Sequence, residues 1–193
     1  MDAKETTWQE PEKESTKTFE AIKAKLTQNK VKFDVTEHKA VRTCEEAAQV
    51  RKVTVDSGAK AMLIKDSGKK LAKENVPYYL AVMSASKRFS NKAFKKMINC
   101  KNIKFASEEE CYKITGCLTG AVPPFGSVFS VPVWVDRSLS KEKEINFNAG
   151  LRTHSISMSY EDYFKVEAPT FHVFTEEEIT LGDLPVEAAK GGD

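Results

Sequence analysis

The sequence predicts a single α/β domain of the α+β kind. Its 193 residues suit one domain with tails, and 40% hydrophobic with 30% charged residues is typical of a soluble globular protein. Periodicity indicates about six strands and about four helices. Strands follow one another as often as they alternate with helices, so a doubly wound sheet is not favoured.

The first third of the chain predicts a helix, a strand and a second helix. Residues 1–14 are polar and charged, and we expect a disordered leader. A cap at Ser15 or Thr16 begins a helix whose apolar residues recur at helical spacing. Residues 31–36 alternate like a strand with one buried face. The sequence Thr43-Cys-Glu-Glu46 is a capping box and predicts a helix behind it.

The middle of the chain predicts two strands and two helices. Residues 60–65 form the first strand, which a turn at 66–68 ends. Residues 78–84 are nearly all apolar, which predicts a central strand buried on both faces. Residues 91–98 show helical spacing, and a capped helix starts at Ser107.

The last third begins with a loop, Gly116-Cys-Leu-Thr-Gly-Ala-Val-Pro-Pro-Phe-Gly126. Three glycines and two prolines predict a rigid loop with exposed amides, which serves either as a connector or as a ligand-binding wall. We expect one or two strands in 127–135, interrupted by Pro132, and further strands at 145–148 and 154–158. A short helix begins at Ser159, and a flexible tail or linker over 184–193 ends the chain.

Several classes of protein are disfavoured by composition. No apolar run approaches the roughly 20 residues of a membrane helix, and the N-terminus lacks the apolar segment of a signal peptide. The four cysteines form no Cys-x-x-Cys pair, and only three histidines could join them. We therefore expect no metal, no cofactor, no membrane partner and a cytoplasmic location with reduced thiols.

Charge is unevenly distributed. Residues 60–104 carry 12 Lys or Arg against two acids, a net charge of +10, whereas residues 161–193 carry nine acids against two lysines. Such a basic segment can hold a polyanion such as RNA, but by itself it is more often a solvated lysine-rich face. Only five of the 30 basic residues are arginine, so dense bidentate phosphate contacts are not indicated.

Lys60 is the first candidate functional residue, because it lies in the apolar strand Ala59-Lys-Ala-Met-Leu-Ile64. Lysine seldom points into a core unless it is paired or useful. Simple alternation, with Lys60 facing water, remains the alternative. The chain has neither a Gly-x-Ser-x-Gly elbow nor a phosphate-binding P-loop. Among the histidines, His154 is the best ligand candidate because it follows Gly150 closely, and a polar turn is its alternative role.

These segments, in this order, resemble the YbaK/prolyl-tRNA-synthetase-associated domain family. The resemblance covers roughly residues 16–166, and the glycine-proline loop and the lysine strand are its most specific parts. It rests on these motifs: His38 followed by Thr43-x-Glu-Glu-Ala-Ala48, Ala59-Lys-Ala-Met-Leu-Ile-Lys65, Thr115-Gly-Cys-Leu-Thr-Gly-Ala-Val-Pro-Pro-Phe-Gly126, Val133-Trp-Val-Asp136, Asn148-Ala-Gly150 and His154-Ser155.

The resemblance implies a mixed, strongly curved, barrel-like sheet surrounded by helices, within an editing domain over 15–183. It implies an aminoacyl-tRNA deacylase that hydrolyses mischarged aminoacyl-tRNA, with a small amino acid removed. Some members are free-standing, and others belong to prolyl-tRNA synthetase. The acceptor end of tRNA and a synthetase such as prolyl-tRNA synthetase are therefore the expected partners.

The family's essential lysine falls on Lys60, which the resemblance makes the catalytic residue. It could hold the terminal phosphate or ribose and orient the ester, while loop amides hold the carbonyl oxygen. A substrate hydroxyl can assist, so neither a metal nor a triad is required. The substrate-binding residues implied are Thr43, Gly116, Gly120, Pro123, Pro124, Phe125, Gly126, Asn148, Ala149, Gly150 and His154.

The loop departs from the family at Cys117 and Ala121, and the strand departs at Asn148. Cys117 is interpreted as a small wall residue. Two other hypotheses stay open: a module that binds tRNA or a synthetase without catalysis, and a regulatory appendage of a larger chain.

Overall fold

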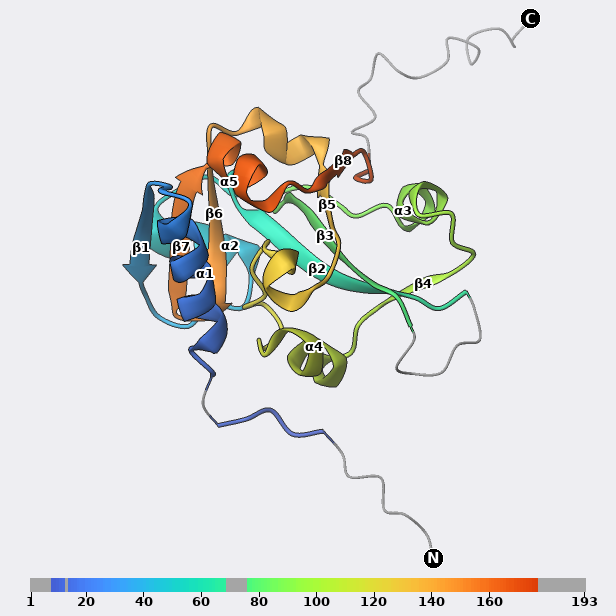
Figure 1. Ribbon diagram of the computed structural model, residues 1–193, viewed down its shortest axis with the longest axis horizontal. Helices are drawn as coiled ribbons and strands as arrows, with labels where there is room; N and C mark the ends of the chain where they lie inside the picture. Colours follow the sequence, from blue (N-terminus) through green and yellow to red (C-terminus); the bar gives the residue numbers. More distant parts are fainter. Residues whose placement is uncertain (1–7, 13, 69–75, 177–193) are drawn as a thin grey trace, which may run out of the picture.

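Eight strands of the described chain divide between two sheets (Figure 1). The computed structural model describes residues 8–12, 14–68 and 76–176. The strands are β1 (Phe33–Glu37), β2 (Ala59–Asp66), β3 (Tyr78–Ser84), β4 (Ile103–Phe105), β5 (Val133–Asp136), β6 (Glu144–Leu151), β7 (His154–Ser159) and β8 (Thr170–His172). The helices are α1 (Lys17–Gln28), α2 (Cys44–Arg51), α3 (Asn91–Met97), α4 (Glu108–Thr115), α5 (Tyr160–Glu167) and the 3₁₀ helices η2 (Gly126–Phe129) and η3 (Arg137–Lys141).

One sheet has three antiparallel strands in the order β1-β7-β6, and the other has five strands in the order β4-β2-β3-β5-β8. In the larger sheet β2 is antiparallel to β3 and β4, while β3, β5 and β8 are parallel. The prediction of a mixed α/β domain is confirmed. The barrel-like curvature is not confirmed, because the strands form two open sheets that an isolated bridge between Gly58 and Asn146 connects.

β3 occupies the centre of the larger sheet, as its apolar run predicts. Leu80 and Val82 pack into the main core with the smaller sheet and α1, while Ala81 and Met83 face a second core that includes Phe94 of α3. Helices and the other sheet thus cover both faces of β3. Burial of apolar side chains on both faces accounts for a strand with almost no polar residues.

The capping boxes predicted for two helices are present. Thr43 Oγ1 accepts a hydrogen bond from Glu46 N at the start of α2, and Ser107 Oγ accepts one from Glu110 N at the start of α4. α4 ends at Gly116, whose φ of 67° lies in the left-handed region that glycine adopts at low cost. Local signals therefore set the limits of both helices.

One expectation about strands is confirmed in part, and another is wrong. One strand, β5, begins within residues 127–135 just after Pro132, but the chain before it forms η2 and turns at Ser130. Val131 N donates to Gly126 O and closes this turn. β1 was expected to bury one face, yet Val35 is 43% exposed. β1 is an edge strand paired to β7 on one side, which explains its exposure.

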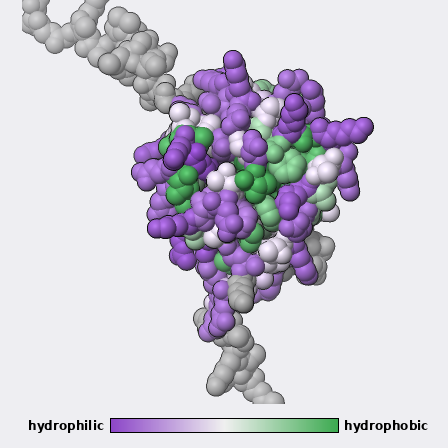
Figure 2. Space-filling model, turned by 90° about the vertical axis from the view of Figure 1, so that its left-hand side faces the viewer, coloured by the Kyte–Doolittle hydropathy of each residue, from purple (hydrophilic) through white to green (hydrophobic). Residues whose placement is uncertain are grey.

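The surface on the side of β1 and α1 is mainly hydrophilic, with small apolar groups interspersed (Figure 2). Among the described residues, the large apolar side chains that are exposed are Val35, Val50, Phe105 and Phe171. No helix in this part of the chain combines the length and apolarity needed to cross a membrane.

Candidate functional site

A cavity of about 240 Å³ lies between the two sheets. β2 and β6 meet where Asn146 N donates to Ser57 O, and β4 pairs with β2 only from Ile64 onward. The first residues of β2 therefore have a paired neighbour in β3 alone, and the cavity opens along their other edge. Its walls come from α2, the chain from Val53 to Val55, the start of β2, the loop around Gly120, and β6.

Lys60 lies in the cavity wall and is half-buried. Its Nζ donates to the backbone oxygens of Ala85 (3.4 Å) and Lys87 (3.0 Å). An ammonium group has three donors, so these two carbonyls leave one for a ligand. Ala59 and Ala61 pack into the main core, as simple alternation expects. The Lys60 side chain between them does not simply face water, because it is half-buried and bound to two backbone carbonyls at the edge of the cavity.

Arg51 also lines the cavity and organises a polar network. Its Nε donates to Ser155 Oγ (2.7 Å), and its Nη2 donates to Asn148 Oδ1. His38 Nε2 contacts the same Ser155 hydroxyl at 2.6 Å. Asn148 Nδ2 in turn donates to Gly120 O (2.7 Å), so the network fixes the cavity's loop to β6.

Arg51 forms no salt bridge within the described chain. Burial lowers the pKa of its guanidinium to about 10, which leaves it charged at neutral pH. The cavity also contains Lys60 and Arg42, and none of the described residues that line it is an Asp or Glu. The site is therefore electropositive and suits an anionic group or a polarised carbonyl oxygen.

Four residues predicted from the sequence meet in this cavity: Lys60, Thr43, Gly120 and Asn148. The Thr43 hydroxyl is already engaged as the cap of α2. Gly120 has φ of 89°, a conformation that favours glycine. Its carbonyl oxygen accepts a hydrogen bond from Asn148 Nδ2, and the loop backbone at Gly120 lines the cavity.

The proline part of the loop lies in the core and does not line the cavity. Pro124 O accepts a hydrogen bond from Tyr163 Oη (3.0 Å), and the Phe125 ring lies 5.4 Å from the Tyr163 ring. Pro123 and Gly126 are buried beside them. A direct role of these residues in ligand binding stays a prediction.

Four further predicted residues lie away from the cavity lining. Gly116 ends α4, Ala149 is fully buried, and Gly150 packs against Thr18. The His154 ring lies 4.9 Å from that of Phe19. Their contact with a ligand also stays a prediction.

Cys117 is buried under the loop, where burial raises the pKa of its thiol to about 11. A thiol with such a pKa is protonated at neutral pH and is a poor nucleophile. Cys44 does line the cavity, and burial raises its pKa as well. Neither thiol fits an activated cysteine. Within the described residues, no cluster of three or more His, Cys, Asp or Glu could hold a metal ion.

Sequence reasoning missed Arg51, Arg42 and Asn146 as cavity residues. A signal for Arg51 was available, since arginine is scarce in this chain and this one follows the buried Ala47 by four positions, one helical turn. It could have been placed on the inner face of α2. Its partners on β6 and β7 are 97 and 104 residues away in sequence, so their identity needed the fold.

A larger hollow of about 970 Å³ lies between the end of β2, β4 and α4. Two of its three lysines have carboxylate partners: Lys65 Nζ lies 2.5 Å from Glu110, and Lys113 Nζ lies 2.5 Å from Glu109. The third, Lys104, is matched in number by Asp66, which also lines the hollow. Because these charges compensate one another, this hollow lacks the electropositive character of the cavity at Lys60.

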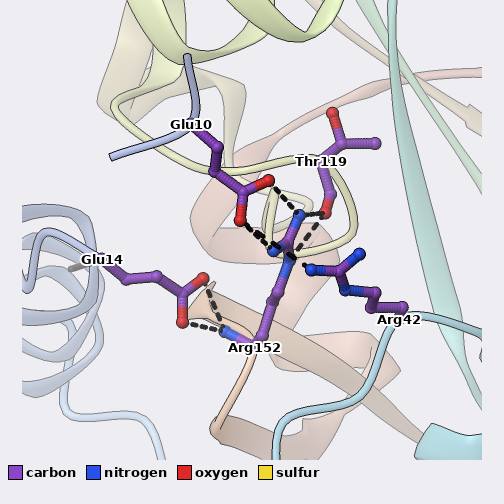
Figure 3. A network of polar contacts seen from close by, with 5 residues as sticks. All are labelled: Glu10, Glu14, Arg42, Thr119 and Arg152. Carbon is purple, nitrogen blue, oxygen red and sulfur yellow. Dashed lines mark hydrogen bonds and ion pairs between the residues drawn. The ribbon is translucent and has the colours of Figure 1, made fainter. Parts of the chain in front are cut away.

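Two acidic side chains of the segment before α1 point toward Arg152, beside Thr119 of the loop (Figure 3). Glu10 forms an ion pair with Arg152 at 2.7 Å, and Glu14 accepts the backbone N–H of Arg152. Arg152 also donates to Thr119 O in the loop. The Trp8 ring stacks 5.3 Å from Tyr112. Part of the leader expected over 1–14 therefore contacts the domain, and the rest lies outside the described residues.

We expect this segment to detach at low pH. The hydrogen bond from Arg152 holds the pKa of Glu10 below its usual 4.5. A depressed carboxyl pKa means that the contact is fully present above 4.5 and is lost as the pH falls through the lower value. In a Trp134→Phe background, Trp8 fluorescence should shift to the red in this window. Glu10→Gln should abolish the step, and a step that persists in that variant would contradict the assignment.

The arrangement can bind a ligand carbonyl or anion without a metal or a nucleophilic triad. Lys60 and Arg51 supply positive charge, and Gly120 supplies backbone at the cavity wall. Electrostatic stabilisation of developing negative charge is a large term in catalysis of acyl transfer. Water is then the available nucleophile.

Comparisons with known proteins identify the family of the chain. A family model described as "Aminoacyl-tRNA editing domain" matches residues 38–166. The chain is 29% identical over 153 residues to the multifunctional Ser/Thr-tRNA deacylase ProXp-y of Escherichia coli (strain K12), with 79% of this chain and 89% of that protein covered. It is 26% identical over 151 residues to the prolyl-tRNA editing protein ProX of Acetoanaerobium sticklandii, with 76% and 88% covered.

A solved structure of a candidate trans-editing enzyme for prolyl tRNA synthetase has the same fold. It superposes with a TM-score of 0.68 at 19% identity, covering 83% of this chain and 98% of that one.

Proposed function

Since the chain belongs to the aminoacyl-tRNA editing domain family, we propose that it hydrolyses the ester of mischarged aminoacyl-tRNA in the cavity at Lys60. The enzyme is an aminoacyl-tRNA deacylase. The observation that carries the proposal is the anchored Lys60 ammonium at the wall of an electropositive cavity that no Asp or Glu lines.

In the proposed reaction, water attacks the carbonyl carbon of the ester and a tetrahedral intermediate forms. The bond from that carbon to the ribose oxygen breaks, the ribose oxygen takes up a proton, and the free amino acid leaves with the hydroxyl of water. Lys60 orients the ester or its terminal phosphate, and positive charge from Arg51 favours the oxyanion. A ribose hydroxyl next to the ester can assist proton transfer.

We propose a small amino acid as the group removed. The cavity of about 240 Å³ is smaller than the roughly 300–1,000 Å³ usual for pockets of drug-sized ligands. Size alone separates amino acids weakly, since one methylene is worth about 1–3 kcal/mol. Polar groups of Asn148 and Arg51 at the cavity favour a side chain that can accept or donate a hydrogen bond.

The proposed partner is the acceptor end of a tRNA, and a synthetase such as prolyl-tRNA synthetase can supply it. The similarity to a prolyl-tRNA editing protein supports this choice. We propose that the editing unit spans 15–183 and acts in the cytoplasm, where charged tRNA is used.

The test is a deacylation assay on a panel of tRNAs charged with Ala, Ser, Cys, Pro or Thr. We expect wild-type protein to release one or two of these amino acids, with at least a tenfold preference over the others, as roughly 1.4 kcal/mol of discrimination would give. If none is released while uncharged tRNA still binds, the non-catalytic binding module becomes the better account.

A further inference from the structure

The segment 85–107 carries seven basic residues and no Asp or Glu. It comprises the loop after β3, all of α3, and β4. We define the α3 basic surface as Arg88, Lys92, Lys95, Lys96, Lys101 and Lys104. Of these six residues, all but Lys95, which is half-buried, are exposed.

Ring contacts hold these charges together on one part of the molecule. Phe89 lies 5.2 Å from Phe94 of α3 and 5.6 Å from Phe105 of β4, measured between ring centroids. Arg88 and Lys104 are the chain neighbours of Phe89 and Phe105. α3 and β4 also lie on the same side of the molecule, away from α1 and β1 (Figure 1).

The α3 basic surface lacks the charge compensation found on the other lysine-bearing helices. Acids one turn away pair with Lys23 in α1, Lys113 in α4 and Lys165 in α5. None of the six residues of the α3 basic surface forms a salt bridge with any other described residue. Glu176 is held near Arg88 by a backbone hydrogen bond but forms no ion pair with it.

This arrangement is unfavourable for α3 by itself. Lys92, Lys95 and Lys96 are spaced three and four residues apart, where like charges repel. The first turn of α3 contains no acid to complement the helix dipole. A face that only contacts water gains nothing from repelling lysines or from a helix start without an acid. A bound polyanion would offset the repulsion and complement the helix dipole.

The loop that carries Arg88 begins at the wall of the cavity. Ala85 lines the cavity, and Lys60 Nζ binds the backbone oxygens of Ala85 and Lys87. Three residues after Lys87, Ser90 caps α3. The positive charge therefore continues along the chain from the cavity to α3.

We propose that the α3 basic surface binds the phosphate backbone of the tRNA acceptor stem whose 3′ end enters the cavity. This inference rests on the proposed function, because that function names the ligand. RNA is favoured over an acidic protein because one polyanion can then occupy the cavity and the adjoining surface together. Lysine makes contacts of charge, without reading base sequence.

The test measures binding of an uncharged tRNAPro transcript by fluorescence anisotropy at several salt concentrations. The variant Lys92→Glu/Lys96→Glu/Lys101→Glu is compared with the matched control Lys17→Glu/Lys32→Glu/Lys141→Glu, which changes net charge equally at exposed lysines elsewhere. Circular dichroism establishes that both are folded. If the glutamate variant fails to fold, the variant Lys92→Ala/Lys96→Ala/Lys101→Ala is measured in its place.

We expect the surface variant to bind about tenfold or more weakly, and the magnitude of its log–log salt slope to fall by up to about 2.7, because each of the three lost phosphate contacts removes about 0.9. The control should keep the wild-type slope. Equal slopes in both variants would overturn the proposal, as would binding of poly-L-glutamate as tight as that of tRNA. The tRNA in this binding test carries no amino acid, so the result does not depend on ester hydrolysis. A protein that failed the deacylation assay would contradict the proposed function, while the binding test would still decide the role of the α3 basic surface.

Discussion

Replacement of Lys60 by alanine is expected to lower the rate of ester hydrolysis by about 10²–10³-fold, the usual effect of removing one group that stabilises developing charge. Lys60 is the half-buried cation whose Nζ is anchored by two backbone carbonyls at the cavity wall. Alanine removes the ammonium group at the cavity wall, together with its hydrogen bonds to the backbone oxygens of Ala85 and Lys87. Single-turnover deacylation of the best substrate in the panel measures the effect.

The matched control is Lys65→Ala, at the other end of the same strand. Lys65 pairs with Glu110 at 2.5 Å and lies outside the cavity. We expect Lys65→Ala to keep the wild-type rate, although it breaks an ion pair. Loss of the same size in both variants would mean that hydrolysis depends on general charge or stability, and would remove the catalytic role of Lys60.

Gly150→Ala is expected to be the most destabilising of the substitutions considered, by roughly 3 kcal/mol, from left-handed strain and overpacking together. Gly150 has φ of 89°. A Cβ there would lie 2.8 Å from Thr18 Cγ2 and 3.1 Å from Phe19 N at the start of α1. Thr18 cannot retreat easily because its Oγ1 donates to Thr115 O.

Gly120→Ala separates strain from crowding. Gly120 has the same φ of 89°, but a Cβ there would approach nothing closer than 3.6 Å. The difference in unfolding free energy between the two variants should therefore be the crowding part, about 1–3 kcal/mol. Urea denaturation measures both. Equal losses would show that α1 does not press on Gly150.

This pair of glycines shows what the sequence could and could not predict. A glycine-rich loop indicates that something approaches the backbone closely, and in this chain the approaching group differs at each glycine. Gly120 borders the cavity and has no close neighbour. Gly150 is approached by α1, and Gly126 is approached by Val131 O, which would lie 2.3 Å from a Cβ at that position. Only the fold identifies the group, because each partner is set by tertiary contacts.

The sequence predicts an element correctly where the element depends on interactions between residues that are close in sequence. The capping boxes at Thr43 and Ser107 and the apolar run of β3 depend on residues close in sequence. η2 was missed because Ser130, with φ of 59°, has no sequence signal for a left-handed turn. Lys60 could be singled out as a cation in an apolar strand. The network of Arg51 could not, since Ser155 is 104 residues away.

The most direct test of the central claim is where a stable substrate analogue binds. The analogue is the terminal adenosine carrying serine through a 3′-amide, and binding is followed by backbone amide shifts in NMR spectra. The account predicts the largest shifts at Lys60, Gly120 and Asn148, which line the cavity between the sheets. Shifts confined to Lys65, Lys104 and Lys113, in the larger hollow beside α4, would contradict it.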